Sequence, residues 1–229
     1  MGGSPYVVTI DRTLVPCPAA LALVWAKGIE APRPTAQPRP FLVELLARVE
    51  SAGEAFVPAG RRAAVRQMLR HGNYRPSGRG KPASEFLLRA ATGGEFPWVN
   101  APVDVNNAIS LESGLPGSIF DAARSGPRLL LRRGEAGERY VFNRSGQEID
   151  LEDLLVVCRR VEGAWVPCGN PVKDAMSTKI SEATTDVVAV LYAPVELPFE
   201  ELRGWGERFR DRLREICGAS EAGVALVRP

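Results

Sequence analysis

Polar side chains gather in three short segments that also carry apolar residues and should be partly buried. The first segment holds Lys81, Ser84 and Glu85, the second Asn100, Asp104, Asn106, Asn107 and Ser110, and the third Lys173, Asp174, Thr178 and Lys179. Buried polar groups need hydrogen-bond partners, so each segment either braces loops or faces a ligand. Bracing is the commoner role for any single residue, but three such segments in one chain favour a polar ligand site.

The residues of the common catalytic sites are scarce in this sequence. A Ser-His-Asp triad or a histidine-ligated metal site would have to use His71, the one histidine, which lies near the predicted end of a helix. Neither the P-loop motif nor a GxGxxG motif is present. We therefore expect no triad, no metal and no nucleotide cofactor.

Positive charge is concentrated in one stretch of the chain, although the net charge of the whole is only +2. Between Phe56 and Arg89 eight basic residues face a single acidic one, Glu85. The basic residues are Arg61, Arg62, Arg66, Arg70, Arg75, Arg79, Lys81 and Arg89. Such a cluster attracts polyanions, of which a nucleic-acid backbone is the commonest. A solvated helix face is the alternative interpretation.

Cysteine usage and hydropathy bear on the compartment. The four cysteines are scattered and form no CxxC pair. Cys158 and Cys168 flank a predicted turn near Gly163 and could face each other across a hairpin; two reduced thiols are the commoner case, and a regulatory disulfide is the alternative. No run approaches the roughly 18 apolar residues that cross a bilayer, and the first residues do not resemble a signal peptide. We therefore expect a cytoplasmic protein.

Apolar periodicity and turn residues predict a mixture of strands and helices. The predicted strands are residues 6–10, 20–26, 128–132, 139–142, 148–151, 154–159, 164–168 and 186–192, and the predicted helices are residues 41–52, 59–71, about 82–92 and 199–217. A further short helix is expected within residues 103–114, capped by Asn106 or Asn107. Most turns between strands are short. The predicted fold class is therefore α+β, with a mostly antiparallel sheet and packing helices.

The length of 229 residues suits one large domain, or one domain with an N-terminal extension. We expect residues 1–55 to supply strands, a Pro-rich loop and a helix packed on the core, and residues 56–229 to form the main domain. The whole is expected to be one compact unit. Residues 186–192 are long and apolar, which is typical of a central strand.

A series of short motifs, in order and over roughly 95 residues, resembles one known module. The motifs are VDVNN at 103–107, LESGLP at 111–116, Phe120-Asp121, RRGEAGE at 132–138, DLLVV at 153–157, Cys168-Gly169 and Thr184-Thr185. Together they resemble the B3/B4 editing module of bacterial phenylalanyl-tRNA synthetase β subunits. The upstream GRGKPASEFLLRA, residues 78–90, is similar to freestanding B3/B4-domain proteins. This resemblance implies a B3/B4-like α+β fold.

The resemblance also implies an activity, the hydrolysis of the ester that joins a wrong amino acid to tRNA. Two departures matter. Ser118 stands where the synthetase module has a histidine, and Val190 or a neighbour stands where it has a glutamate that recognises tyrosine. Tyrosine editing should therefore not be carried over, and the pocket must select another side chain. The expected partner is the aminoacylated 3′ end of a tRNA, with no membrane and no nucleotide cofactor.

Roles for single residues follow from this hypothesis. Candidate water or ester contacts are Asn107, Ser110, Ser118 and Thr178. Candidate substrate-binding residues are Lys81, Ser84, Glu85, Asn100, Asp104, Asn106, Glu138, Lys173, Asp174 and Lys179. Among these, Lys81 and Lys179 would bind the terminal ribose-phosphate. The α-ammonium would be held by Glu85, Asp104 and Asp174, although Asp104 could instead cap its own loop. Candidate tRNA-binding residues are Arg61, Arg62, Arg66, Arg70, Arg75 and Arg79.

Two other functions fit the same residues. A noncatalytic tRNA- or RNA-binding module would keep the basic face and fill the pocket with side chains. A domain that binds or hydrolyses a small metabolite would use the pocket without the basic approach. The sequence therefore leads to a deacylase as the first hypothesis and to these two as alternatives.

Overall fold

Two four-stranded sheets are present in the computed structural model, which describes residues 4–31 and 39–229. The central sheet has the order β10-β2-β9-β3, and the outer sheet has the order β1-β4-β7-β8. The central strands are β2 (Ala19–Lys27), β3 (Gly117–Asp121), β9 (Asp186–Pro194) and β10 (Glu221–Val227). The outer strands are β1 (Val7–Ile10), β4 (Arg128–Arg133), β7 (Leu155–Val161) and β8 (Ala164–Gly169). A small hairpin joins β5 (Arg139–Val141) to β6 (Glu148–Asp150).

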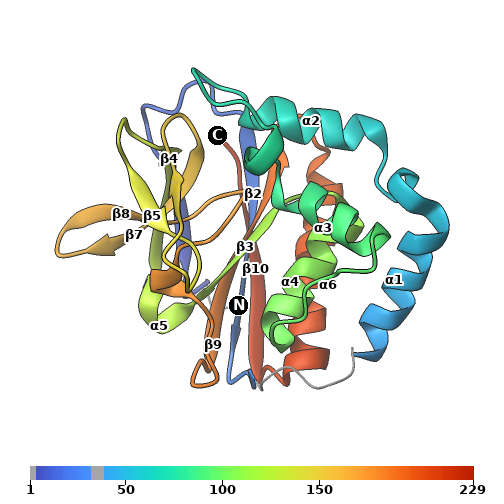
Figure 1. Cartoon of the computed structure of the whole chain (residues 1–229). Coiled ribbons are helices and arrows are strands. Elements are labelled where there is room, and N and C mark those ends of the chain that lie inside the picture. The colour runs from blue at the N-terminus through green and yellow to red at the C-terminus, as the bar shows by residue number, and fades with distance from the viewer. Residues whose placement is uncertain (1–3, 32–38) are drawn as a thin grey trace.

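Six α-helices lie within the described residues. They are α1 (Pro40–Ala52), α2 (Ala59–Leu69), α3 (Ala83–Thr92), α4 (Ala101–Ser113), α5 (Ala122–Ser125) and α6 (Phe199–Cys217). Short 3-10 turns occupy Gly53–Phe56, Gly78–Gly80 and Met176–Thr178. Figure 1 shows three layers, with the outer sheet on the left, the central sheet in the middle and most of the helices on the right.

The central sheet is the core of the molecule. β2 and β9 pair antiparallel along their full lengths, from Ala19↔Pro194 to Lys27↔Asp186. Nearly every residue of both strands is buried, because the outer sheet covers one face and helices including α2 and α6 cover the other. The apolar residues of the central sheet form one cluster with those of the outer sheet that face it, such as Leu129, Leu131 and Val157, whereas Leu130 and Val156 belong to a separate cluster on the other face. Burial on both faces explains why β9 is a continuous apolar run rather than an alternating one.

Helices α1, α3 and α4 share a second apolar cluster beside the central sheet. Its members include Leu42, Leu45, Leu87, Leu88 and Leu111. α4 in turn packs on α6, which lies on β2 and β10. The helical layer therefore holds α3 and α4 at a fixed distance from the central sheet, and the polar residues of these two helices keep a defined position over it.

The predicted α+β class is confirmed, and the predicted pairing is confirmed as mostly antiparallel, with one parallel pair between β1 and β4. The predicted helix 199–217 is α6, and the predicted central strand is β9, between β2 and β3. Strands β3 and β10 and helix α5 were not predicted. The Pro-rich loop expected near residues 32–38 lies outside the described residues.

The predicted cap of the helix within 103–114 was wrong. α4 begins two residues earlier, at Ala101, and its N-cap is Asn100, whose side-chain oxygen accepts a hydrogen bond from the Val103 amide at 3.1 Å. A proline lies in the first turn of α4, where its missing N–H costs nothing. Asn106 and Asn107 are therefore interior residues of α4, and their side chains are not used as caps.

The remaining expectations concern thiols, membranes and domains. All four cysteines are buried and free, and Cys158 is opposite Pro167 in the β7–β8 hairpin rather than opposite Cys168. No helix in the described part of the chain is long and apolar enough to cross a membrane. β2, from the first 55 residues, lies between β10 and β9 in one sheet, while a domain boundary near residue 55 stays a prediction.

Candidate functional site

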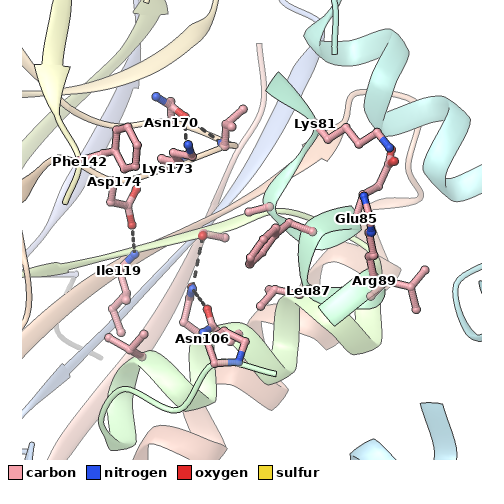
Figure 2. A pocket seen from close by; sticks show the side chains of 18 of the residues that line it. Lys81, Glu85, Leu87, Arg89, Asn106, Ile119, Phe142, Asn170, Lys173 and Asp174 are labelled. Atoms are coloured by element: carbon pink, nitrogen blue, oxygen red, sulfur yellow. Dashed lines mark hydrogen bonds between the residues drawn. The ribbon is translucent and has the colours of Figure 1, made fainter. Parts of the chain in front are cut away.

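A pocket of about 610 Å³ lies between the helical layer and the loops that join the two sheets. Its walls come from α2, α3 and α4, from strand β3, from Phe142 after β5 and from the loop of residues 170–180 before β9. Figure 2 shows Lys81, Glu85 and Arg89 on one side of it and Lys173, Phe142 and Asp174 on the other, with Asn106 below. The volume is in the usual range for sites that hold a small molecule or one end of a larger one.

All three polar segments of the sequence contribute to this pocket. The predicted site residues that line it are Lys81, Glu85, Asn106, Asn107, Lys173, Asp174, Lys179, Arg62, Arg66 and Arg79. The predicted site residues that do not line it are Ser84, Asn100, Asp104, Ser110, Ser118, Glu138, Thr178, Arg61, Arg70 and Arg75. The fold therefore brings the segments together but uses only part of each.

Asp174 is the carboxylate with spare hydrogen-bonding capacity in the pocket. Its Oδ2 accepts from the Ile119 amide of β3 at 3.2 Å, as Figure 2 shows, whereas its buried Oδ1 has no partner among the described residues. Burial raises the pKa of Asp174 to about 6, against the opposing effects of the Lys179 charge and of hydrogen bonds, including one from Ser118. At neutral pH the group is mostly ionised and is ready to accept a proton or to bind a cation.

Asn170 shapes the loop that carries Asp174. Its Oδ1 accepts from the amides of Val172 and Lys173 at 2.8 and 2.9 Å, and its Nδ2 donates to the Tyr140 hydroxyl. The Tyr140 hydroxyl donates in turn to the Lys173 carbonyl at 2.6 Å. Asn170 is 1% exposed, so these bonds are protected from water and fix the turn.

The floor of the pocket includes two neighbouring amides of α4. The Asn106 Nδ2 donates to the Gly117 carbonyl at 3.3 Å and to the Asn107 Oδ1 at 3.4 Å. The Asn106 Oδ1 is buried and has no partner among the described residues. A buried unpaired acceptor is costly unless a ligand or a water donates to it, so Asn106 is a second candidate contact for a polar ligand.

Glu85 differs from Asp174 because its charge is already neutralised. Arg66 of α2 donates from Nε to Glu85 Oε1 at 2.6 Å and from Nη2 to Oε2, a bidentate pair between α2 and α3. The hydrogen bond to Glu85 raises the pKa of Arg66. The carboxylate side chain is 8% exposed and the arginine side chain 44%, so the pair lies at the mouth with its arginine toward solvent.

Lysine and aromatic side chains form the opposite wall. The Lys173 Nζ lies 3.8 Å from the centroid of the Phe142 ring, a cation–π contact. Burial and the nearby charge of Arg79 lower the pKa of Lys173. This ammonium therefore keeps its position beside the pocket and is available to an anionic group.

Three of the four candidate catalytic residues lie outside the pocket lining. Ser118 is fully buried, and its hydroxyl bonds the Tyr192 hydroxyl at 3.0 Å and the Asn170 carbonyl at 3.3 Å. Thr178 is also buried and donates to the Cys168 carbonyl at 3.3 Å. Ser110 is buried with no partner among the described residues. Asn107 is the candidate that lines the pocket.

Several other predicted residues brace the structure. Asp104 accepts from the Val99 amide at 2.9 Å and lies 3.6 Å from Arg39, which fits the alternative that it caps its own loop. Glu138 forms a bidentate pair with Arg132 at 2.7 and 2.6 Å.

Four of the six predicted tRNA-binding arginines have partners for their side chains. Arg61 pairs with Glu201 at 2.6 Å, Arg62 with Glu54 and Arg66 with Glu85. Arg75 is exposed and donates from Nη1 to two carbonyls of its own loop.

The electrostatic balance of the pocket is basic. Seven lysine or arginine side chains and three carboxylates line it within the described part of the chain. Two of the arginines, Arg62 and Arg66, also border a shallow hollow along α2. No described group of three His, Cys, Asp or Glu side chains is placed to hold a metal ion. The arrangement can bind an anionic group at its mouth and a cationic or polar group at its floor.

Sequence reasoning missed two residues that organise the pocket. Asn170 precedes Pro171, and an Asn-Pro pair is a turn signal that could have drawn attention to it. Phe142 carries no local signal, because its role depends on the Lys173 ammonium, 31 residues away in the chain.

Comparison with known proteins gives this geometry a family context. The B3/4 domain family matches residues 78–195. The phenylalanine–tRNA ligase beta subunits of Nocardia farcinica and Thiobacillus denitrificans are 30% and 31% identical to this chain over 129 and 111 residues. These alignments cover 47% and 48% of this chain but only 15% and 14% of those proteins. Apart from Glu54, Arg62 and Arg66, the residues that line the pocket lie within the matched span.

One solved structure aligns over nearly the whole chain. It is an N-terminal fragment of the phenylalanyl-tRNA synthetase beta subunit from Pyrococcus horikoshii, with a TM-score of 0.46 and 12% identity. The alignment covers 96% of this chain and 50% of that chain. This chain thus spans half of the solved fragment and about one seventh of the two ligase subunits.

Proposed function

Because this chain belongs to the B3/4 domain family and matches only a small part of longer ligase subunits, we propose that it is a trans-acting aminoacyl-tRNA deacylase. In this reaction water attacks the ester carbonyl, and the products are a free amino acid and a tRNA with a free 3′-terminal ribose hydroxyl. The observation that carries the proposal is the open pocket, which combines a basic lining with an unpartnered carboxylate oxygen on Asp174.

The aminoacyl end of the tRNA would be bound by the Asp174 carboxylate and by the lysines that line the pocket. The Asp174 carboxylate, with its free Oδ1, would hold the α-ammonium of the amino acid. Lys81, Lys173 and Lys179 would contact the terminal ribose-phosphate, since ammonium groups bind phosphate oxygens as point charges. Glu85 is occupied by Arg66, and Asp104 lies outside the lining, so neither has this role in the arrangement described.

Catalysis would rest on positioning, because an aminoacyl ester is already activated. The unpartnered Asn106 Oδ1 would accept a hydrogen bond from the attacking water and orient it, and the Asn107 Nδ2 would donate to the developing oxyanion. Ser118 would act indirectly, by supporting the Asp174 loop from behind. Ser110 and Thr178 do not line the pocket, so the proposal assigns them no direct part.

The remaining parts of the proposal concern partners. The tRNA would approach over Arg62, Arg66 and Arg79, which line the basic mouth. Neither a metal nor a nucleotide is assigned a role in the hydrolysis. The relatives are subunits of a tRNA ligase, and a cytoplasmic protein that acts on tRNA is the corresponding proposal for this chain.

The test is an assay of the full chain on a panel of tRNAs, each charged with an amino acid other than its own. We expect release of the amino acid from at least one of them. The variant Asp174→Asn should raise KM roughly 10- to 100-fold, the usual loss for a hydrogen bond to a charged group. The exposed Glu215→Gln on α6 is the control, because it removes a carboxylate far from the pocket lining.

One observation favours a second candidate, a noncatalytic module that binds the charged end of tRNA. No serine, threonine or tyrosine is among the described residues that line the pocket. Binding of charged tRNA without release from any member of the panel would support this candidate. If the chain neither bound charged tRNA nor released an amino acid from it, both functions would be contradicted.

A further inference from the structure

Arg66 belongs to two surfaces at once. Arg62 and Arg66 lie one turn apart on α2, Arg70 is the C-cap residue of this helix, and the three arginines border a hollow of about 480 Å³ with Ala59, Ala63 and Gln67. Residues four apart share one face of a helix, so Arg62 and Arg66 follow one another along α2 with about 6 Å of rise between them. Together with Arg70 at the helix end they are called the α2 ridge. Arg62 and Arg66 also line the pocket. The ridge therefore leads into the pocket mouth.

The three arginines of the α2 ridge differ in their ion-pair partners. Arg62 pairs at 3.1 Å with Glu54, whose side chain is 79% exposed, so this pair is weak and easily replaced. Arg70 is exposed and has no ion-pair partner among the described residues. Arg66 makes the bidentate pair with Glu85, whose side chain is 8% exposed. Of the three arginines, Arg66 alone is joined to a buried carboxylate of the pocket.

We propose that an RNA phosphate on the α2 ridge draws Arg66 away from Glu85, and that the freed Glu85 carboxylate then attracts the α-ammonium of the aminoacyl group into the pocket from the wall opposite Asp174. This inference rests on the proposed function, because it assumes that the pocket binds the charged 3′ end. It adds a regulatory link, in which contact with the RNA backbone switches the amino acid site on.

The two partners differ in exposure, and this difference permits the exchange. The Arg66 side chain is 44% exposed and can turn toward solvent, where a phosphate offers the same bidentate geometry as a carboxylate. Glu85 is nearly buried, and a buried carboxylate without a partner is strongly unfavourable. The departure of Arg66 therefore leaves Glu85 open to another cation, and the α-ammonium of the substrate competes for it with Lys81 and Arg89 on the same wall.

The position of Glu85 in α3 suits a carboxylate. It lies in the first turn of α3, where the free N–H groups and the helix dipole favour a negative charge. While Arg66 is paired with Glu85, Asp174 is the carboxylate of the described pocket lining that has no ion-pair partner. An amino acid ester without RNA should then bind weakly, and the enzyme would spare free amino acid esters. Because coupling between two sites is reciprocal, the amino acid should also strengthen RNA binding.

The test measures the binding of the methyl esters of phenylalanine, serine and arginine by calorimetry. Each is titrated into the full chain alone and into the chain saturated with a tRNA shortened by its 3′-terminal nucleotide. The shortened tRNA supplies phosphates but leaves the pocket empty. For at least one ester we expect the dissociation constant to fall about 10-fold when the RNA is bound.

Variants separate the switch from ordinary charge effects. In Arg66→Gln the ester should bind tightly without RNA, and the shortened tRNA should change its affinity less than about twofold. The matched Arg62→Gln, one turn away on the α2 ridge, should weaken RNA binding to a similar degree but keep the 10-fold coupling at saturating RNA. Glu85→Gln should abolish the coupling and tighten the binding of the shortened tRNA, because Arg66 no longer has to leave a carboxylate to reach the phosphate.

Equal ester affinity with and without RNA in the wild-type chain would overturn the inference, as would failure of all three esters to bind the RNA complex. The panel of mischarged tRNAs tells this failure from failure of the proposed function. Release from mischarged tRNA without coupling would leave the deacylase standing and reject the switch. Coupling without release would support the switch and assign the pocket to the binding module.

Discussion

At the scale of single residues, the two main carboxylates of the pocket have opposite surroundings. Glu85 has both oxygens bonded to one guanidinium, whereas Asp174 has one oxygen bonded to a backbone amide and one buried oxygen unpartnered. The raised pKa of Asp174, about 6, follows from its burial. Burial leaves Asp174 Oδ1 without a partner, so it can bind a ligand, but burial of the charge also lowers the stability of the folded chain.

This cost predicts a pH-dependent effect of Asp174→Asn on stability. A carboxyl whose folded pKa is raised from 3.8 to about 6 is ionised above pH 6 against a desolvation penalty, so the wild type loses stability as the pH rises through this range. The asparagine variant carries no such penalty. Its free energy of unfolding relative to the wild type should therefore increase between pH 4 and pH 7.5, by roughly 1–3 kcal/mol.

Denaturant unfolding at several pH values measures this difference. Glu215→Gln, which changes an exposed carboxylate, should show a difference that does not vary with pH to the same degree. A constant difference between wild type and Asp174→Asn from pH 4 to pH 7.5 would contradict the account of Asp174.

Single residues also show which parts of the candidate site could be predicted from the sequence. The three polar segments could be picked out because each combines polar groups with apolar neighbours that must be buried, and the fold brings parts of all three to one pocket. The direction of each side chain was not predictable. Ser118 bonds Asn170 and Tyr192, which lie 52 and 74 residues further along the chain, so no local pattern reveals that its hydroxyl is used inside the core.

At the scale of elements, the start of α4 is set by one side chain. The Asn100 cap and the proline of the first turn together begin the helix that carries Asn106 and Asn107. The sequence contains this signal, an asparagine two residues before a proline, but the polar run at Asn106 and Asn107 offers a competing and denser one. α6 was predicted with its true bounds because its apolar stripe, the preceding Pro198 and Gly218 all agree.

Loss of the α4 cap should cost measurable stability. Asn100→Ala leaves the Val103 amide without its acceptor and should lower the free energy of unfolding by about 1 kcal/mol. Asn100→Ser keeps a capping oxygen and should lie within a few tenths of the wild-type value. Thermal unfolding of the two variants provides the measurement. Equal losses in both would mean that the side-chain bond does not stabilise α4.

Two glycines of α6 should respond in opposite ways to the same substitution. A Cβ at Gly206 would lie 2.7 Å from the Val224 Cγ2 and 3.3 Å from the Ala22 Cβ, whereas a Cβ at Gly204 meets nothing within 4 Å. Gly206→Ala should therefore destabilise by about 1–3 kcal/mol through overpacking. Gly204→Ala should stabilise by up to about 1 kcal/mol through helix propensity. Stabilisation by both would show that α6 does not pack closely on β2 and β10.

Strand β10 shows why some elements escape prediction. Gly223 pairs with Trp25 of β2, and a Cβ at this glycine would lie 2.7 Å from the indole ring. The glycine is needed by a cross-strand neighbour that is almost 200 residues away. Locally it reads as a strand breaker, since glycine weakens a strand that has no such reason for it.

At the scale of the whole molecule, a small net charge conceals an uneven distribution. The chain has 29 basic and 27 acidic residues, yet the pocket and the α2 ridge have a clear excess of positive side chains. Association with a polyanion depends on such local fields rather than on the net charge.

Neutralising the α2 ridge should change the salt dependence of tRNA binding. The triple variant Arg62→Gln, Arg66→Gln and Arg70→Gln removes up to three phosphate contacts, so the slope of log K against log salt should become less steep by about 2. The triple variant Arg128→Gln, Arg144→Gln and Arg160→Gln removes the same charge from exposed positions outside the described pockets. Filter binding between 50 and 200 mM salt, roughly the range in which such effects are large, gives the slopes. Equal slopes in the two variants would reject the α2 ridge as the contact surface.

The place of β9 has a practical consequence for anyone who wishes to shorten this protein. One of its two neighbours, β2, lies outside the matched span of residues 78–195, and so does β10 beyond it. In a fragment excised at those limits, the nine residues of β9 would form an exposed apolar edge strand whose N–H and C=O groups lack hydrogen-bond partners on one side. Such an edge invites pairing between fragments, so the excised piece would aggregate instead of reporting on the chemistry of the intact chain.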